Sequence, residues 1–253
     1  MKLLLDIGNS RLKWAWWDQG LKPGGAQTHV GQSPEAVLAA IDLRLMPTQI
    51  WAASVAAPIL RAALEAWAMR HCNVPVRWVH SQSSACGVHN AYARPERLGV
   101  DRWLAVIAAY HRVRGAAFVV DAGTALTVDA VDTRGRHLGG LIAPGLGTQR
   151  QSLHKSTQLR ASTPEGRADW LGADTDMAVA WGTLHGVIGF VERVYTGIRR
   201  EHGDIVANIL PIITGGEASL LLPYLGPEWV AAPDLVLEGL AHVAVEAEAT
   251  PLA

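Results

Sequence analysis

The sequence predicts an α/β protein made of two duplicated halves, each a mixed β-sheet flanked by helices, with a cleft between the halves. Three observations lead to this fold class. The chain has 253 residues, which suits one large domain or two of ordinary size. Segments with the patterns of strands and helices alternate along it, as is typical of α/β folds. The third observation is an internal repeat.

The repeat divides the chain near its middle. Residues 3–13 and residues 118–128 share one pattern: three apolar residues, an Asp, a small or apolar residue, a Gly and then a second strand-like run. The Asp residues of the two copies, Asp6 and Asp121, lie 115 residues apart. A match at nearly half the chain length indicates duplication. We therefore expect an N-terminal half at 1–115 and a C-terminal half at 116–253.

The first half is predicted to open with a strand, a tight turn and a second strand, because Gly8 separates two apolar runs. Its first helix should have Ser33 as N-cap and Pro34 in the first helical position. Its last helix is amphipathic. The predicted strands are Lys2–Asp6, Leu12–Asp18, Ile50–Val55 and Val76–His80, and the predicted helices are Glu35–Leu45, Pro58–Arg70 and Asp101–Arg112.

The second half repeats the opening strand, turn and strand around Gly123. A long helix and a strand that ends in two glycines follow. The predicted strands are Ala117–Asp121, Leu126–Val131, His137–Ile142 and Ile209–Thr214, and the predicted helices are Asp176–Arg200, Glu217–Leu222 and Val236–Glu246. Lys155–Asp174 is rich in polar and turn residues and is expected to be a loop.

Charge and composition exclude several classes of protein. The formal net charge is -1, whereas a general nucleic-acid binder carries a basic excess. Trp14, Trp16 and Trp17 are therefore interpreted as sheet packing rather than as base-stacking residues. No apolar run approaches the roughly 18 residues of a membrane span, and Asp6 interrupts the N-terminal leucines before a signal peptide forms. We expect a cytoplasmic protein.

The two cysteines, Cys72 and Cys86, do not form a CxxC pair. In a cytoplasmic protein they are expected to be free thiols, and a disulfide in an exported protein is the alternative. His71, His80 and His89 are nine residues apart, which is not the spacing of metal ligands on one helix or strand.

The first Gly turn, Asp6-Ile7-Gly8-Asn9-Ser10, is a candidate phosphate site. Backbone N–H groups in such a turn can surround phosphate oxygens. The adjacent Asp6 carboxylate can hold Mg²⁺, often through water. Lys13, on the return strand, could reach a phosphate. The alternative is an ordinary hairpin turn.

The second turn, Asp121-Ala122-Gly123-Thr124-Ala125, repeats this pattern and adds the Thr124 hydroxyl. Two such turns facing each other across a cleft could hold a triphosphate from both sides. Gly215-Gly216 follows a predicted strand, and the lack of side chains there permits close approach of a flat ligand such as adenine.

The stretch Gly99-Val100-Asp101-Arg102 places an acidic and a positively charged side chain at the start of a predicted helix. A helix N-terminus favours anions. Asp101 is ionised at neutral pH and can accept a proton from a reacting hydroxyl, while Arg102 can bind a carboxylate or phosphate with two hydrogen bonds. The alternative is that Asp101 only caps the helix. The sequence lacks the GxxxxGK[ST], HExxH and GxSxG motifs, and Arg150 interrupts a GxGxxG pattern that starts at Gly145.

Four stretches together resemble type III pantothenate kinases, a family of the sugar kinase, Hsp70 and actin superfamily. They stand in the family's order and spacing: Asp6–Lys13, Gly99–Arg102, Asp121–Asp129 and Gly139–Gly145. Ser10 stands where the family commonly has Thr, and the region after Gly145 is less similar. The resemblance implies actin-like (ribonuclease H-like) halves. It also implies ATP-dependent phosphorylation of the 4′-hydroxyl of pantothenate, the first step of coenzyme A biosynthesis.

The resemblance also implies a role for each matched residue. Asp101 would be the general base, and Asp121 would hold a monovalent cation, K⁺ or NH₄⁺. The implied ATP and Mg²⁺ site comprises Asp6, Ile7, Gly8, Asn9, Ser10, Arg11, Leu12, Lys13 and Thr124, with Asp6 as the Mg²⁺ residue. The implied pantothenate site comprises Tyr92, Gly99, Val100, Asp101, Arg102 and Thr175.

The family forms homodimers through the long helix of the second half. The apolar residues that would form this surface here are Met177, Ala178, Val179, Ala180, Trp181 and Leu184.

Two other functions are considered. One is a kinase of the same superfamily that acts on a sugar or a small acid, against which Gly99–Arg102 argues. The other is a regulatory accessory factor on the same fold. Such a factor would tolerate the loss of Asp101 or Asp121, and both are present.

Overall fold

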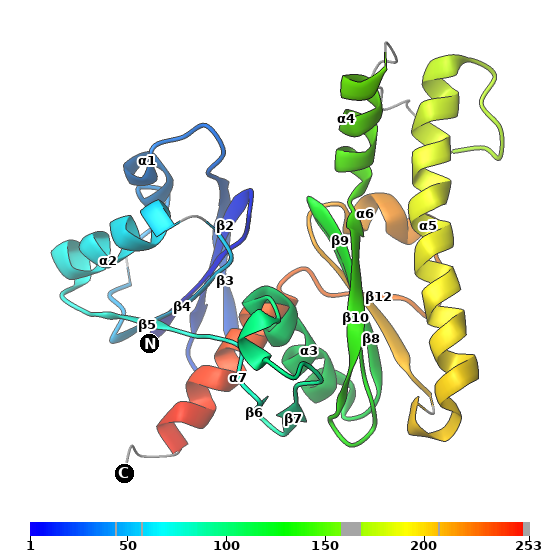
Figure 1. Ribbon diagram of the computed structural model, residues 1–253. Helices are drawn as coiled ribbons and strands as arrows, with labels where there is room; N and C mark the ends of the chain where they lie inside the picture. The colour runs from blue at the N-terminus through cyan, green and yellow to red at the C-terminus, as the bar shows by residue number, and fades with distance from the viewer. Residues whose placement is uncertain (44, 57, 158–167, 207, 250–253) are drawn as a thin grey trace. The chain divides into compact units, whose positions relative to one another are not determined.

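The computed structural model describes residues 1–253 except 44, 57, 158–167, 207 and 250–253 (Figure 1). Contacts within the chain define two compact units. The first comprises Met1–Arg112 together with the C-terminal segment from Asp234, and the second comprises Val113–Pro233. The predicted halves, 1–115 and 116–253, were derived from the repeat in the sequence rather than from contacts, and they stay a prediction. The contacts place the last helix with the first unit.

The first unit is built on a five-stranded sheet in the order β3-β2-β1-β4-β5. The β3-β2-β1 part is antiparallel, and β1, β4 and β5 are parallel. Its strands are β1 (Lys2–Ile7), β2 (Arg11–Trp17), β3 (Leu21–Thr28), β4 (Gln49–Ser54) and β5 (Val76–Trp78). Its helices are α1 (Pro34–Leu38), α2 (Pro58–Cys72), α3 (Val100–Val113) and α7 (Leu235–Ala249). A hairpin of β6 (Ser84–Ala85) and β7 (Val88–His89) and a 3₁₀ turn at Pro95–Arg97 precede α3.

Alternation along β1 separates its two faces. Leu3, Leu5 and Ile7 lie in one core cluster with apolar residues of α1 and α2. Lys2 lies on the other face, where its Nζ donates to Glu248 of α7 over 2.7 Å. Because side chains alternate along a strand, Asp6 belongs to this second face, which α7 covers (Figure 1). The core role predicted for Trp14 and Trp16 is confirmed, since they are 7% and 6% exposed.

The second unit repeats this architecture, with the strand order β10-β9-β8-β11-β12. Its strands are β8 (Ala117–Ala122), β9 (Ala125–Val131), β10 (His137–Pro144), β11 (Leu210–Thr214) and β12 (Val230–Ala231). Its helices are α4 (Leu146–Ser156), α5 (Thr175–His202) and α6 (Ala218–Leu221), with 3₁₀ turns at Gly203–Val206 and Leu222–Tyr224. Helix α5 runs along the sheet (Figure 1), and its Leu184, Val187 and Val191 share a core with Phe118 and Val128.

The two sheets are equivalent strand by strand. In each, a central strand pairs antiparallel with the next strand of the sequence and parallel with a later one. The repeat found in the sequence therefore corresponds to a repeat of topology. The predicted class of two mixed sheets flanked by helices is confirmed.

Some predicted boundaries were wrong. Glu35–Leu45 was predicted to be one helix, but α1 ends at Leu38. Beyond it, the N–H groups of Ala40 and Ile41 donate to carbonyl oxygens three residues earlier. The Ile41 side chain then packs in the core. Ser33 caps α1 as predicted, since its Oγ accepts from Ala36 N. The strand predicted at Val76–His80 ends at Trp78, and the helix predicted at Glu217–Leu222 is α6 followed by a 3₁₀ turn.

The two longest elements that were not predicted are β3 and α4. Strand β3 contains Pro23, Gly24 and Gly25, which disfavour strands, but it lies at the edge of its sheet, where such residues are tolerated. Helix α4 buries only Leu146 and so lacks an apolar stripe. Of the loop predicted at Lys155–Asp174, the first two residues belong to α4, and 158–167 lie outside the described residues.

The glycines of β3 are required by Trp14 on the neighbouring strand. A Cβ at Gly24 would collide with the Trp14 carbonyl oxygen and lie 2.6 Å from its Cδ1. A Cβ at Gly25 would lie 2.5 Å from Trp14 Cζ2. The sheet has a register shift between Trp14 and Ala15 at this point. The indole therefore lies where β3 side chains would otherwise be.

We expect Gly24→Ala to lower the free energy of unfolding by about 2 kcal/mol, because overpacking a filled site typically costs 1–3 kcal/mol. Gly20→Ala is the matched control, since a Cβ there meets no atom within 4 Å. Urea unfolding followed by tryptophan fluorescence measures both variants. Equal midpoints for the two would contradict the packing role of Gly24.

Candidate active site

The first Gly turn joins β1 to β2. Asp6 is the second-to-last residue of β1, and its Cα partner across the antiparallel pair is Lys13. The predicted carboxylate and ammonium therefore lie on the same face of the sheet. Gly8 N donates to Arg11 O over 3.0 Å, which closes the turn. His29 Nε2 lies 2.8 Å from Gly8 O and ties the turn to the end of β3.

Not every residue predicted for the ATP site presents a side chain to it. Ile7 and Leu12 are fully buried in the core of the first unit, so only their backbone can meet a ligand. Asn9 and Arg11 are exposed, and Ser10 is half-buried. Thr28 Oγ1 and His29 N both donate to Ser10 O over 3.1 Å, which fixes the tip of the turn.

The second turn occupies the equivalent place in the other unit and is one residue shorter. Asp121 is the second-to-last residue of β8, and its antiparallel partner is Thr127. Gly123 N donates to Ala125 O over 3.1 Å. Two further bonds converge on Thr124 O, from Gly145 N over 3.1 Å and from Thr148 Oγ1 over 2.6 Å. The second turn is thus tied to the start of α4.

Gly215 packs directly against this turn. It follows β11 with φ +95°, and a Cβ there would collide with Asp121 Oδ1 and Ala122 O. Both the backbone angle and the close approach require glycine. The sequence pattern Gly215-Gly216 is therefore explained by contact within the unit, and an approach of adenine to it stays a prediction.

Glu217 is a residue of this region that sequence reasoning missed. Its carboxylate accepts from Leu146 N and Gly147 N, both over 2.9 Å, and so caps the N-terminus of α4. Its own N–H donates to Ala122 O over 2.8 Å. One residue therefore connects the end of β8, the Gly215 segment and α4. A cap supplied from a distant segment leaves no local sequence signal, unlike Ser33 before α1.

Of the residues predicted for the pantothenate site, all but Thr175 lie at or near the start of α3 in the first unit, and Thr175 belongs to the second unit. Asp101 lies in the first turn of the helix, and its Oδ1 accepts from Arg102 N over 2.8 Å. Gly99 leaves room for this carboxylate, because a Cβ there would lie 2.6 Å from Asp101 Oδ1. The Gly-Val-Asp-Arg sequence thus has a steric reason for its glycine.

Arg102 is only 6% exposed. Its Nη1 donates to the Tyr92 hydroxyl over 3.2 Å, and its Cζ lies 5.9 Å from the centre of the Tyr92 ring. A buried guanidinium is costly unless acceptors surround it, and the Tyr92 hydroxyl is one such acceptor. Tyr92, Asp101 and Arg102 are thus brought together as predicted. Thr175 is the first residue of α5, after Asp174, whose carboxylate caps that helix.

The apolar surface expected on the long helix is found only in part. Val179, Ala180 and Leu184 are buried within their own unit, because α5 packs on the sheet of that unit. Ala178 is exposed, and Met177 and Trp181 are half-buried. Near the start of α5, Trp170 and Leu171 are instead strongly exposed. The Trp170 ring stacks on His185 with 5.2 Å between ring centres.

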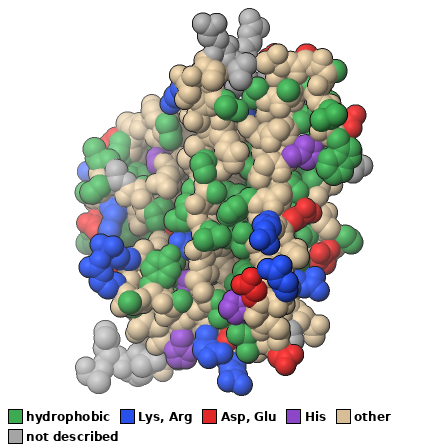
Figure 2. All heavy atoms as spheres, turned by 45° about the vertical axis from the view of Figure 1, so that its right-hand side comes forward, with side chains coloured by type: hydrophobic (Ala, Val, Ile, Leu, Met, Phe, Trp, Pro, Cys, Tyr) green, Lys and Arg blue, Asp and Glu red, His purple; other side chains and the backbone are tan. Residues whose placement is uncertain are grey.

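The remaining observations concern the cysteines, the candidate metal ligands and the surface charge. Both cysteines are free thiols, as predicted. Within the described ranges, no three His, Cys, Asp or Glu residues gather as a metal-binding group. Positive and negative side chains are intermixed on the face drawn in Figure 2, in keeping with the net charge of -1.

Solved structures share the fold of this chain. A Campylobacter jejuni protein described as a conserved Baf family transcriptional activator covers 98% of this chain and 100% of its own, with a TM-score of 0.60 and 20% identity. A Sinorhizobium meliloti protein described as a 2-dehydro-3-deoxygalactonokinase covers 100% of both chains, with a TM-score of 0.56 and 14% identity. These likenesses concern the fold alone, and they place the chain in the class of actin-like folds.

The sequence sets the family within this class. The family model for type III pantothenate kinases matches residues 2–197. The type III pantothenate kinase of Nitrosococcus oceani is 37% identical over 253 residues, 96% of this chain and 94% of the relative. That of Laribacter hongkongensis is 38% identical over 247 residues, 96% of this chain and 98% of the relative. The chain belongs to the type III pantothenate kinase family.

We expect Glu217→Gln to loosen the start of α4. The amide loses the negative charge that stabilises a helix N-terminus and keeps one acceptor for two N–H groups, which together should cost about 1 kcal/mol. Hydrogen exchange at the Leu146 and Gly147 amides should accelerate. Glu192→Gln, at an exposed position of α5, is the control, and unchanged exchange at both amides in the Glu217 variant would contradict the capping role.

Proposed function

We propose that the protein transfers the γ-phosphoryl group of ATP to the 4′-hydroxyl of pantothenate, with Asp101 as the general base. Family membership supports the reaction. The observation that carries the assignment of residues is the group of Asp101, Arg102 and Tyr92 at the start of α3. The alternatives, another superfamily kinase or a regulatory factor, have only fold-level likeness at 20% identity or less in their favour.

The chemistry asked of these residues is positioning and proton transfer. Phosphoryl transfer depends mainly on alignment and neutralisation of charge. Asp101 accepts the proton of the attacking hydroxyl, and its orientation is fixed by the bond from Arg102 N. Arg102 binds the pantothenate carboxylate, since a guanidinium matches a carboxylate in geometry and charge. Tyr92 forms part of the substrate wall. Thr175, which lies in the second unit, is assigned as a further pantothenate contact by the family resemblance alone.

The two Gly turns would hold ATP. In each turn, the N–H of the glycine is used within the turn. Contacts to phosphate therefore fall to the tip residues, Asn9 and Ser10 in one unit and Thr124 in the other. Lys13 supplies positive charge beside Asp6. The remaining predicted residues, Ile7, Gly8, Arg11 and Leu12, act by shaping the first turn.

The residues present fit the cations that the family implies. At Asp121, a carboxylate oxygen and the Ala122 carbonyl oxygen converge on the bare backbone of Gly215. Oxygen donors suit K⁺ or NH₄⁺, and Asp6 offers a carboxylate suited to Mg²⁺. When bound, the cations neutralise phosphate charge. With no group of three ligands among the described residues, the rest of each coordination shell would come from phosphate and water.

We also propose that the protein is a homodimer and that it is located in the cytoplasm. Exposed Trp170 and Leu171 beside α5 support an interface near that helix. In the part of the chain that the structure describes, no helix is long and apolar enough to cross a membrane.

We expect Asp101→Asn to lower kcat by about 10²- to 10⁴-fold, the usual contribution of a general base. Asn keeps the Oδ1 acceptor for Arg102 N, so the fold and ATP binding should be retained. Asp18→Asn is the control, because Asp18 forms an exposed ion pair with Lys22. A coupled ATP-consumption assay with pantothenate measures both, and near-normal turnover in the Asp101 variant would overturn the assignment.

We expect K⁺ or NH₄⁺ to stimulate the reaction and Na⁺ at equal ionic strength to do so far less. Asp121→Asn should abolish the difference between the salts, because it removes the charge that holds the monovalent cation. Initial rates with each chloride salt test this. Equal rates in K⁺ and Na⁺ for the unaltered protein would rule out the cation role of Asp121.

A further inference from the structure

The β6–β7 hairpin lies just before the pantothenate residues in the chain. Its two-residue turn is Cys86-Gly87, with φ of 49° and 73°. Positive φ at both positions is the signature of a type I′ turn, which favours Asn or Gly in the first position. Cys86 is an unfavourable residue there, so contacts from outside the hairpin must help to hold the turn.

Two helices of the same unit supply those contacts. Glu246 of α7 accepts the Cys86 N–H with both carboxylate oxygens, each at 2.9 Å, and its Oε2 accepts from Cys86 Sγ over 3.4 Å. His111 of α3 lies with its Nε2 2.7 Å from Cys86 O. Its ring stacks on His242 of α7, with 4.3 Å between ring centres. The hairpin tip is thus held at its N–H, its thiol and its carbonyl.

The hairpin in turn holds Tyr92. Asn90 N donates to Ser83 O over 2.9 Å, and Asn90 Nδ2 donates to Gln82 O over 3.1 Å. Asn90 Oδ1 accepts from Tyr92 N over 2.9 Å. The Tyr92 hydroxyl accepts from Arg102. A series of hydrogen bonds, connected by the backbone of the hairpin, therefore runs from Glu246 through Cys86 and Asn90 to Tyr92.

We propose that Glu246 is a positioning residue that fixes Tyr92 through the β6–β7 hairpin and thereby sets the affinity for pantothenate. The inference rests on the proposed function, because Tyr92 is assigned there to the substrate wall. It adds a residue of the C-terminal helix, 160 positions from Cys86, to the determinants of substrate binding. Glu246 does not touch the substrate.

The state of the Cys86 thiol supports this arrangement. The residue is 8% exposed. Burial, followed by the charge of Glu246 and its hydrogen bond, raises the pKa of the thiol to about 12. The thiol therefore stays protonated and donates to the carboxylate at any physiological pH. Loss of Glu246 would remove the hydrogen-bond acceptor of the thiol. The reactivity of Cys86 would then report on the state of the hairpin.

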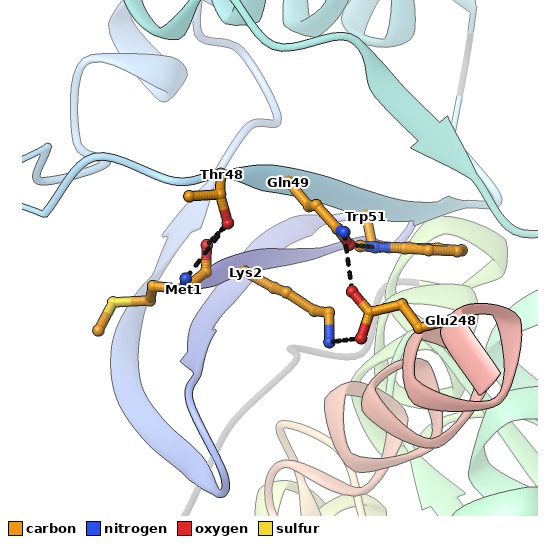
Figure 3. Close-up of polar contacts among 6 residues, drawn as sticks. All are labelled: Met1, Lys2, Thr48, Gln49, Trp51 and Glu248. Atoms are coloured by element: carbon orange, nitrogen blue, oxygen red, sulfur yellow. Dashed lines mark hydrogen bonds and ion pairs between the residues drawn. The ribbon is translucent and has the colours of Figure 1, made fainter.

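Glu248 provides a matched control on the same helix. Its carboxylate accepts from Lys2 Nζ over 2.7 Å and from Gln49 Nε2 over 2.8 Å (Figure 3). These partners belong to β1 and β4 rather than to the hairpin. A substitution at Glu248 therefore disturbs a side-chain link of α7 to its unit but leaves the series from Glu246 to Tyr92 intact.

The kinetic test compares Glu246→Ala, Glu246→Gln and Glu248→Ala with the unaltered protein. We expect Glu246→Ala to raise KM for pantothenate about tenfold, within the range for residues that act through others. KM for ATP and kcat should change by less than about twofold. Glu246→Gln keeps one acceptor and should fall between. Glu248→Ala should leave all three constants unchanged.

A double-mutant cycle tests the route. In a Tyr92→Ala background, Glu246→Ala should add little to KM for pantothenate, because the two residues act in series. Full additivity of the two effects would overturn the route through Tyr92. Equal increases in KM for pantothenate and for ATP would overturn the proposal as a whole.

A test without catalysis uses the thiol, in a Cys72→Ser background. At pH 8 a thiol of pKa about 12 is thiolate in roughly one molecule in 10⁴, so Cys86 should react very slowly with iodoacetamide. Glu246→Ala should accelerate alkylation at least about tenfold, and Glu248→Ala should not. Unchanged reactivity in Glu246→Ala would overturn the fastening role even if the unaltered protein does not phosphorylate pantothenate.

Discussion

Alternation along a buried central strand is the constraint on which the rest of this structure depends. Leu3, Leu5 and Ile7 place one face of β1 in a core, so Asp6 is directed to the opposite face. The same rule directs Asp121 away from the core that holds Val120 and Ala122. A carboxylate one residue before the end of each strand therefore meets a turn whose geometry is fixed by its glycine. A one-residue shift of either strand would bury the acid.

Close approach of backbone is the second recurring theme. Gly24, Gly99 and Gly215 each stand where a Cβ would collide with or crowd a neighbour: the Trp14 backbone, the Asp101 carboxylate and the second turn. These glycines do not share a motif, and their reasons differ. At Gly99 and Gly215 the glycine leaves space for a carboxylate. These two glycines therefore serve the local packing and the placement of a candidate binding carboxylate at the same time.

The predictable parts of the molecule were those with local signals. The strand, Gly and strand pattern gave both turns, and Ser33-Pro34 gave the start of α1. Strand β3 was missed because its pairing with β2, rather than its own Pro23 and glycines, makes it a strand. Helix α4 was missed because its cap, Glu217, comes from 70 residues later in the chain. Arg102 was predicted from its place at the start of a predicted helix, and Tyr92 through the family resemblance. Glu246 has no local signal, because its partner is distant in sequence.

The return of α7 to the first unit has a consequence for the order in which the protein is made. Residues up to 112 leave the ribosome long before the helix that covers their sheet, although domains generally fold as their sequence emerges. The second unit interrupts the first in the chain and can complete its own sheet beforehand. During synthesis, the nascent chain therefore passes through a stage in which the second unit is complete. At that stage the first unit still exposes the face of its sheet that carries Asp6.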